Sequence, residues 1–263
     1  MLESPLDYSD GEYRLDMAAL EKRLADPQAS LFILCNPHNP VGKIWDRQTL
    51  ATIGELCKKH GVTVISDEIH CDMTAPGKSY IPFASVSDTC RAIGATCISA
   101  SKTFNIAGLQ SAAVSVSDPV LRHKIWRGIN TDEVGEPNVF GAEAAVAAFR
   151  YGGEWLDALR EYIFDNKRTA AEMLSDTEVR IVPSEATYLL WADCGAVTDD
   201  TDRLADFIRT ETGLYISAGA QFGGNGKRFV RINVACPRSV VRDGMERFKR
   251  GIKLFKDNFK GTN

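Results

Sequence analysis

Short apolar runs alternate with helix-like patterns along the first half of the chain. Leu31–Cys35 is a continuous apolar run of strand length, and Val62–Ser66 is a second one, rich in β-branched residues. Between them, apolar residues recur at helical spacing from Asp46, a candidate N-cap, to Gly61. Buried strands that alternate with helices indicate an α/β domain with a mostly parallel sheet. Two further strands are predicted at Ala92–Ile98 and Ala112–Val116.

The pattern changes after about Gly135. Asn138–Arg150 is alanine-rich and helical, and Glu154–Ser175 has the apolar period of a long amphipathic helix. We predict two domains: a larger one over residues 1–152, and a smaller C-terminal α/β domain over residues 153–263 that includes the long connecting helix. The smaller domain is expected to contain strands at Val179–Val182, Tyr188–Asp193, Leu214–Ser217 and Phe229–Val234 and helices at Thr201–Thr212 and Ser239–Phe255.

Charge and hydropathy exclude several classes of partner. The chain of 263 residues has 31 basic and 35 acidic side chains and a net charge of −4, so we expect neither nucleic acid nor an anionic membrane as a partner. Its apolar runs are far shorter than the ~20 residues of a membrane helix. The opening residues lack the basic and apolar regions of a secretory signal, and we expect a cytoplasmic protein.

The cysteines and one glycine-rich segment were considered as candidate sites. Seven cysteines occur without any Cys-x-x-Cys pair and without clustered ligands, which indicates free thiols in a reducing compartment and no metal site. The segment from Gly219 to Arg228 resembles a phosphate loop, but Gln221 and Arg228 stand where that motif requires glycine and a hydroxyl residue. We interpret it as the loop before the last strand.

Polar residues follow three of the predicted strands. Asn36 begins an Asn-Pro-His-Asn-Pro-Val-Gly segment, Asp67 follows the second strand, and Ser99–Gly108 contains Lys102. Taken singly, these segments are typical of a turn, a helix cap and a polar loop. In a parallel sheet, however, ligands bind beyond the carboxyl ends of the strands, where all three segments lie.

In this order and spacing, the three segments resemble the fold-type I enzymes that use pyridoxal 5′-phosphate (PLP), the class I/II aminotransferase superfamily. The resemblance covers nearly the whole chain. It implies that Lys102 forms a Schiff base with PLP, Asp67 pairs with the pyridine nitrogen and Asn36 contacts the phenolic oxygen. It also implies that Ser99, and more weakly Ser101, binds the cofactor phosphate. Near the C-terminus, Arg231-Ile232-Asn233 resembles the segment whose arginine binds the substrate α-carboxylate.

Physical chemistry is consistent with these roles. PLP withdraws electrons best when its ring nitrogen is protonated, and the carboxylate of Asp67 would raise the pKa of that nitrogen. Lys102 must lose its proton before it forms an imine and can then act as a general base. The planar guanidinium of Arg231 suits bidentate binding of a carboxylate, which a lysine ammonium does not.

Two segments resemble one branch of the superfamily, the cystathionine β-lyases or cysteine-S-conjugate β-lyases. They are Cys35–Trp45 and Ser101–Gly108, and His70, three residues after Asp67, indicates the same branch. The resemblance assigns His70 to the cofactor site, where many aminotransferases have a tyrosine. It implies β-elimination from cystathionine or a cysteine-like amino acid, giving pyruvate, ammonia and a thiol. Transamination is the close alternative, and a non-catalytic remnant or regulatory protein is the second.

Family members carry an additional N-terminal part before the segment corresponding to Leu6–Leu20. It supplies a glycine-rich turn for the phosphate and an aromatic ring that stacks on PLP, for which we find no counterpart here. We therefore expect this chain to be the C-terminal portion of a longer enzyme and to bind PLP weakly by itself. The resemblance also implies a homodimer.

Overall fold

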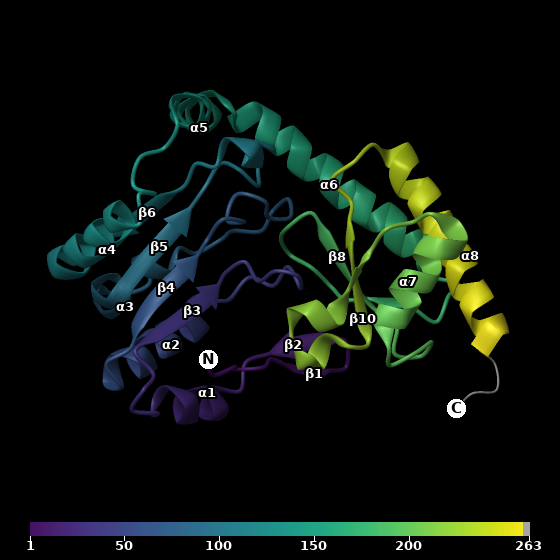
Figure 1. Cartoon of the computed structure of the whole chain (residues 1–263), viewed down its shortest axis with the longest axis horizontal. Helices are drawn as coiled ribbons and strands as arrows, with labels where there is room; N and C mark the ends of the chain where they lie inside the picture. Colours follow the sequence, from purple (N-terminus) through teal and green to yellow (C-terminus); the bar gives the residue numbers. More distant parts are fainter. Residues whose placement is uncertain (260–263) are drawn as a thin grey trace. The chain divides into compact units, whose positions relative to one another are not determined.

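The first sheet has the predicted mostly parallel α/β arrangement. The computed structural model describes residues 1–259. Its first sheet has the order β3-β4-β5-β6, in which the first three strands are parallel and β6 is antiparallel (Figure 1). Residues 92 and 93 do not belong to the strand predicted at Ala92–Ile98, because a helix capped by Ser87 continues to Ile93. The strands are β3 (Leu31–Cys35), β4 (Thr63–Asp67), β5 (Gly94–Ile98) and β6 (Ala113–Val116).

Helices cover one face of this sheet. α2 begins after Asp46, whose carboxylate accepts a hydrogen bond from the Thr49 amide at 2.8 Å, as the N-cap prediction requires. Leu34 and Val64 of the sheet belong to one buried apolar cluster with residues of these helices, and burial of such side chains is the main term that stabilises the fold. The covering elements are α1 (Met17–Leu24), α2 (Arg47–Lys59), η1 (Phe83–Ser85) and α3 (Asp88–Ile93).

The opposite face of the sheet is exposed at β3, whereas Ala95 and Val116, which continue the same face on β5 and β6, are buried. Leu31 and Ile33 alternate with the buried side chains of β3 and are 50% and 63% exposed. The helices that follow the sheet, α4 (Pro119–Thr131) and α5 (Val139–Tyr151), also expose large apolar side chains, including Phe140 and Phe149. Exposed apolar surface of this extent is typical of surfaces that bind another polypeptide.

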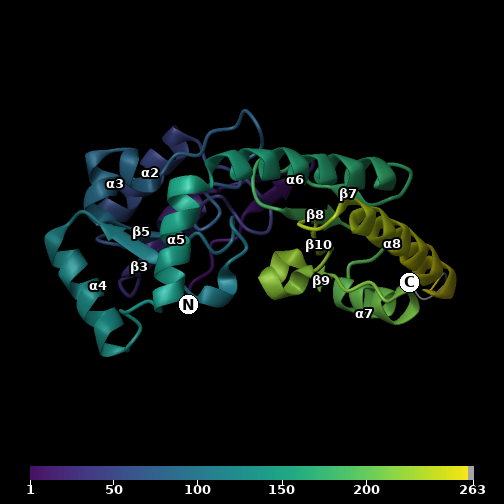
Figure 2. The same cartoon turned by 90° about the horizontal axis from the view of Figure 1, so that it is seen from above.

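The C-terminal sheet is antiparallel, with the order β7-β8-β10-β9. Three helices, α6, α7 and α8, surround β8 and β10 (Figure 2), and their side chains form a second buried apolar cluster with those of the two strands. Most predicted elements are present, but the strand expected at Leu214–Ser217 is wrong: only Ser217 is extended in β9, because Leu214 packs against the helices instead. The elements are α6 (Gly153–Leu174), β7 (Arg180–Ile181), β8 (Leu189–Asp193), α7 (Thr201–Thr212), β9 (Ser217–Ala218), η3 (Gly219–Phe222), η4 (Gly224–Gly226), β10 (Phe229–Asn233) and α8 (Arg238–Phe259).

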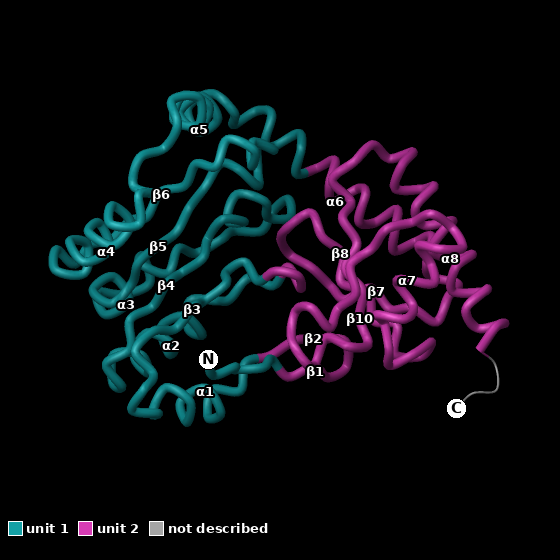
Figure 3. Tube along the Cα trace, in the orientation of Figure 1, with its two compact units in different colours: residues 1–6, 15–38, 43–160 teal, residues 7–14, 39–42, 161–263 magenta. Residues whose placement is uncertain are grey.

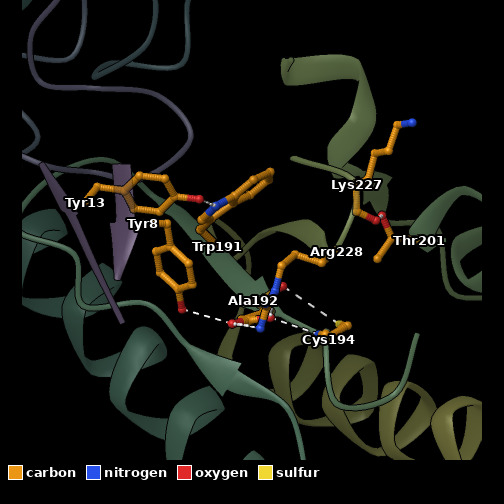
Figure 4. Close-up of polar contacts among 10 residues, drawn as sticks. Tyr8, Tyr13, Trp191, Ala192, Cys194, Thr201, Lys227 and Arg228 are labelled. Carbon is orange, nitrogen blue, oxygen red and sulfur yellow. Dashed lines mark hydrogen bonds and ion pairs between the residues drawn. The ribbon is translucent and has the colours of Figure 1, made fainter. Parts of the chain in front are cut away.

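An N-terminal hairpin packs on this second sheet. The hairpin consists of β1 (Asp7–Ser9) and β2 (Glu12–Arg14). The Tyr8 hydroxyl donates to Asp193 at 3.0 Å, and the Trp191 indole donates to the Tyr13 hydroxyl at 2.9 Å (Figure 4). Arg228 binds the same Asp193 carboxylate in a bidentate pair. Local sequence pattern did not predict this association.

The chain forms two compact units (Figure 3). Unit 1 contains residues 1–6, 15–38 and 43–160, and unit 2 contains residues 7–14, 39–42 and 161–263. The division between the units falls inside α6. The domain boundary predicted between residues 152 and 153 stays a prediction. No helix among the described residues is long and apolar enough to span a bilayer. None of the seven cysteines, all of which lie among the described residues, forms a disulfide.

Candidate active site

Three parallel strands end at the same level. Cys35 of β3 lies opposite Asp67 of β4, and Asp67 lies opposite Cys97 of β5. Because neighbouring strands are ~4.8 Å apart, the segments that leave their carboxyl ends start side by side. The sheet register thus brings Asn36, Asp67 and the Ser99–Lys102 loop to one edge of unit 1.

Asn36 is fully buried and is held by two hydrogen bonds. Its backbone amide donates to the carbonyl of Asp67 at 3.1 Å, and its side-chain oxygen accepts from the amide of Trp45 at 3.1 Å. The side-chain nitrogen Nδ2 has no hydrogen-bond acceptor among the described residues. A buried amide nitrogen without an acceptor costs free energy, so this donor suits a ligand oxygen such as the phenolic oxygen of PLP.

Asp67 is half-buried at the end of β4, where one carboxylate oxygen accepts from the Ile69 amide at 3.2 Å. The neighbouring Glu68 points to the opposite side and is buried, and it accepts from the Ser66 hydroxyl at 2.8 Å and the Phe83 amide at 3.0 Å. Burial raises the pKa of the Glu68 carboxyl. The two acids therefore differ: Glu68 holds η1, and Asp67 remains for a ligand. His70 is buried in the turn that follows.

The Ser99 hydroxyl is engaged within its own loop. It donates to the Ser111 carbonyl at 2.6 Å, and its oxygen accepts from the Ser101 amide at 3.0 Å, with the Ser101 hydroxyl 2.8 Å away. A hydroxyl has only one proton to donate. Ser99 could bind a phosphate only by giving up the bond to Ser111, whereas Thr103 has a buried hydroxyl with no partner among the described residues. Sequence reasoning did not consider Thr103.

Lys102 is half-buried in the loop that follows β5, and its ammonium makes no ion pair or hydrogen bond within the described chain. Phe104 anchors this loop to unit 1. Its ring stacks on Trp155 with centroids 5.5 Å apart and meets Phe149 edge-on at 6.2 Å. Gly152 lies directly against the same ring, where a β-carbon would collide with it. Local sequence pattern does not predict this anchor, because it depends on helices about fifty residues downstream.

Arg231 lies on β10 in unit 2, half-buried. Its Nη1 donates to the side-chain oxygen of Asn39 at 3.5 Å, and its guanidinium lies 4.4 Å from the centre of the Phe222 ring. Burial lowers the pKa of the guanidinium, and the nearby Tyr188 acts in the opposite direction. An arginine stays charged at any physiological pH, so this side chain can bind a carboxylate.

The family model described as aminotransferase class I and II matches residues 4–248, which is most of the chain. The chain belongs to the class I and II aminotransferase family. Among curated members of this family, it is 40% identical over 254 residues to cystathionine beta-lyase PatB of Bacillus subtilis and 35% identical over 233 residues to protein MalY of Escherichia coli. These alignments cover 96% and 88% of this chain.

Solved structures of proteins that contain PLP have the same fold. Cystalysin from Treponema denticola, which contains PLP, superposes with a TM-score of 0.93 at 30% identity, covering 97% of this chain and 65% of cystalysin. The PLP-bound C-S lyase from Staphylococcus hominis superposes with a TM-score of 0.87 at 35% identity, covering 95% and 64%. The chain spans 66% of the length of PatB and 59% of the length of MalY.

Proposed function

We propose that this chain is the cofactor- and substrate-binding part of a PLP-dependent carbon–sulfur β-lyase. The observation that carries the proposal is the shared level at which β3, β4 and β5 end, because it gathers Asn36, Asp67 and Lys102 at one edge of the sheet. The similarity to cystathionine beta-lyase PatB and to the Staphylococcus hominis C-S lyase supports the reaction class. The substrate we propose is cystathionine or another S-substituted cysteine.

The described residues fit the cofactor at three of its edges. The unpartnered Nδ2 of Asn36 would donate to the phenolic oxygen, and His70, buried in the turn after β4, would belong to the same cofactor site. The Asp67 carboxylate would hold a positive charge at the pyridine nitrogen. Hydroxyls of the Ser99–Thr103 segment would contribute to phosphate binding, with Thr103 better placed to donate than Ser99 and Ser101, whose hydroxyls bond to Ser111 and to each other.

When bound, PLP supplies an electron sink for the negative charge that develops at the substrate α-carbon. Lys102 would attach to the cofactor through its amine, which requires that it first lose a proton. Once the substrate amine has displaced Lys102 from the cofactor, the Lys102 amine would take the proton from the substrate α-carbon as a general base. Arg231 would bind the substrate carboxylate through its guanidinium fork. Overall, an S-substituted cysteine and water would give pyruvate, ammonia and a thiol.

Product analysis tests this proposal against its alternatives. The protein with excess PLP is incubated with cystathionine, with and without an added 2-oxo acid, and Lys102→Ala is the background control. A lyase releases pyruvate and thiol in equal amounts without any 2-oxo acid. An aminotransferase leaves the carbon–sulfur bond intact and requires the 2-oxo acid as acceptor. A protein that carries PLP on Lys102 and still does neither above the background is a non-catalytic member of the family.

We also propose a homodimer in the cytoplasm. Exposed apolar side chains in unit 1, such as Ile33 and Phe140, support an interface, and seven cysteines without a disulfide support a reducing compartment. Sedimentation velocity tests the dimer: a species of twice the 28.9 kDa chain mass is expected, and it should weaken in Phe140→Lys. A monomer at all concentrations would contradict this part of the proposal.

A further inference from the structure

Lys167 is a buried lysine that the proposed reaction does not use. It lies on α6 in unit 2 and is only 7% exposed. Its ammonium donates to the Ser184 hydroxyl at 2.8 Å and to the Ala186 carbonyl at 2.9 Å, and it lies 4.7 Å from the centre of the Phe164 ring. Lysines are almost never buried without a specific partner, so this one has a role to explain. Burial lowers the pKa of Lys167 to about 7.

The loop of residues 184–186, which Lys167 holds, is hydrogen-bonded to Gly42. The amides of Glu185 and Ala186 both donate to the Gly42 carbonyl, at 2.8 and 2.9 Å. Gly42 has a φ of +74°, a conformation that side-chain-bearing residues rarely adopt. A β-carbon there would collide with the Ser184 hydroxyl and lie 2.5 Å from the Ala186 carbonyl oxygen. Gly42 therefore fits against this loop only as glycine.

Gly42 closes a short segment that also carries Asn39. Residues 39–42 belong to unit 2, although the residues on both sides of them, His38 and Lys43, belong to unit 1. Asn39 accepts the hydrogen bond from Arg231, the residue proposed to bind the substrate carboxylate. A fixed position for Asn39 therefore limits the directions in which the Arg231 guanidinium can point.

The close Ser184–Lys167 pair also has the composition of a serine–lysine catalytic dyad, in which a neutral lysine accepts the serine proton. The hydrogen bonds exclude that role. The Ser184 hydroxyl donates to the Ala186 carbonyl at 2.8 Å, and Lys167 acts as a donor to both. The amides of Glu185 and Ala186, which could have stabilised an oxyanion, are both engaged by Gly42.

We propose that Lys167 is a positioning residue for the substrate-carboxylate site: it fixes the Ser184–Ala186 loop, which holds Gly42 and the Asn39 that orients Arg231. This inference rests on the proposed role of Arg231. Removing the ammonium should loosen the loop and the 39–42 segment together, without displacing the strands on which Lys102 and Asp67 depend.

The test is hydrogen exchange at the Glu185 and Ala186 amides, measured with and without substrate, in wild type and in Lys167→Met. Lys249→Met is the matched control, because that lysine pairs with Asp176 on the surface of the same unit. Below pH 7, where Lys167 is charged, loss of its hydrogen bonds to the loop should speed exchange at these two amides roughly tenfold or more. The control and the amides of β8 and β10 should not change.

Gly42→Ala should disrupt the same hydrogen bonds between Gly42 and the 184–186 loop, because its β-carbon would collide with that loop. It should therefore also speed exchange at the Glu185 and Ala186 amides. Combined with Lys167→Met it should add little, because both changes release one contact. In the PLP-loaded protein, Lys167→Met should raise KM for the amino acid more than it lowers kcat, with an unchanged cofactor spectrum. Unaltered exchange at Glu185 and Ala186, or faster exchange throughout unit 2, overturns the inference. If exchange changes locally while wild type binds no amino acid, the proposed role of Arg231 fails instead.

Discussion

Replacing Lys167 with methionine should change how the stability of the protein depends on pH. In the folded protein, burial lowers the pKa of this lysine from 10.5 to about 7. Between these two values the unfolded chain binds one proton more than the folded chain. Stability must then rise with pH in this window, because the folded state no longer has to carry a buried charge. Lys167→Met removes the titrating group and with it this rise.

The size of the effect follows from the two pKa values. Each pH unit of difference corresponds to about 1.4 kcal/mol, so burying the charged lysine lowers stability by roughly 5 kcal/mol below pH 7. That penalty should shrink by about 3 kcal/mol between pH 7 and pH 9.5. The free energy of unfolding of wild type should therefore increase by this amount relative to Lys167→Met over the same range.

Urea unfolding at several pH values measures this difference. Trp191, 2% exposed in unit 2, makes tryptophan fluorescence a suitable probe, and circular dichroism should follow the same transition. Other groups titrate in both proteins, so their contributions cancel in the difference. Lys249→Met should run parallel to wild type. A constant difference between wild type and Lys167→Met from pH 7 to pH 9.5 would show that the lysine keeps its ordinary pKa and would refute the reasoning.

Three further substitutions test the site. Asp67→Ala should lower turnover by orders of magnitude while the covalent PLP adduct still forms, each tenfold loss being about 1.4 kcal/mol of transition-state stabilisation; near-normal turnover would remove Asp67 from the mechanism. Arg231→Lys should weaken amino-acid binding at least tenfold and leave the cofactor spectrum unchanged, since only the bidentate fork is lost. Gly152→Ala should displace Phe104 and slow adduct formation, whereas Gly153→Ala, where a β-carbon meets nothing, should not; equal effects would contradict the anchoring role of Phe104.

Local signals in the sequence were enough to predict most of the elements. The helix Arg47–Lys59 was predictable because Asp46 caps it and its apolar residues repeat with helical period. The strands Leu31–Cys35 and Thr63–Asp67 were predictable because continuous apolar runs of that length suit a sheet. The gathering of Asn36 and Asp67 also followed, since both leave parallel strands at the carboxyl end.

Features that depend on distant partners were not predictable. The hairpin of residues 7–14 is held by Tyr8 and Asp193, which are 185 positions apart. Lys167 has the helical neighbourhood of an ordinary surface lysine, and only the Ser184–Ala186 loop makes it a buried one. Ser99 matched a family position, yet its hydroxyl is engaged by Ser111, a contact that local spacing does not encode.

The central claim, that Lys102 binds PLP covalently, can be measured directly. The protein is incubated with excess PLP and reduced with borohydride, and its peptides are mapped by mass spectrometry. The reduced adduct should be found on Lys102, in a peptide that spans Ser99–Gly108 and carries the absorbance of the attached pyridoxyl ring. It should be lost in Lys102→Ala and should persist in Lys43→Ala. An adduct that maps to Lys43, Lys78 or another lysine, or that survives in Lys102→Ala, would contradict the account.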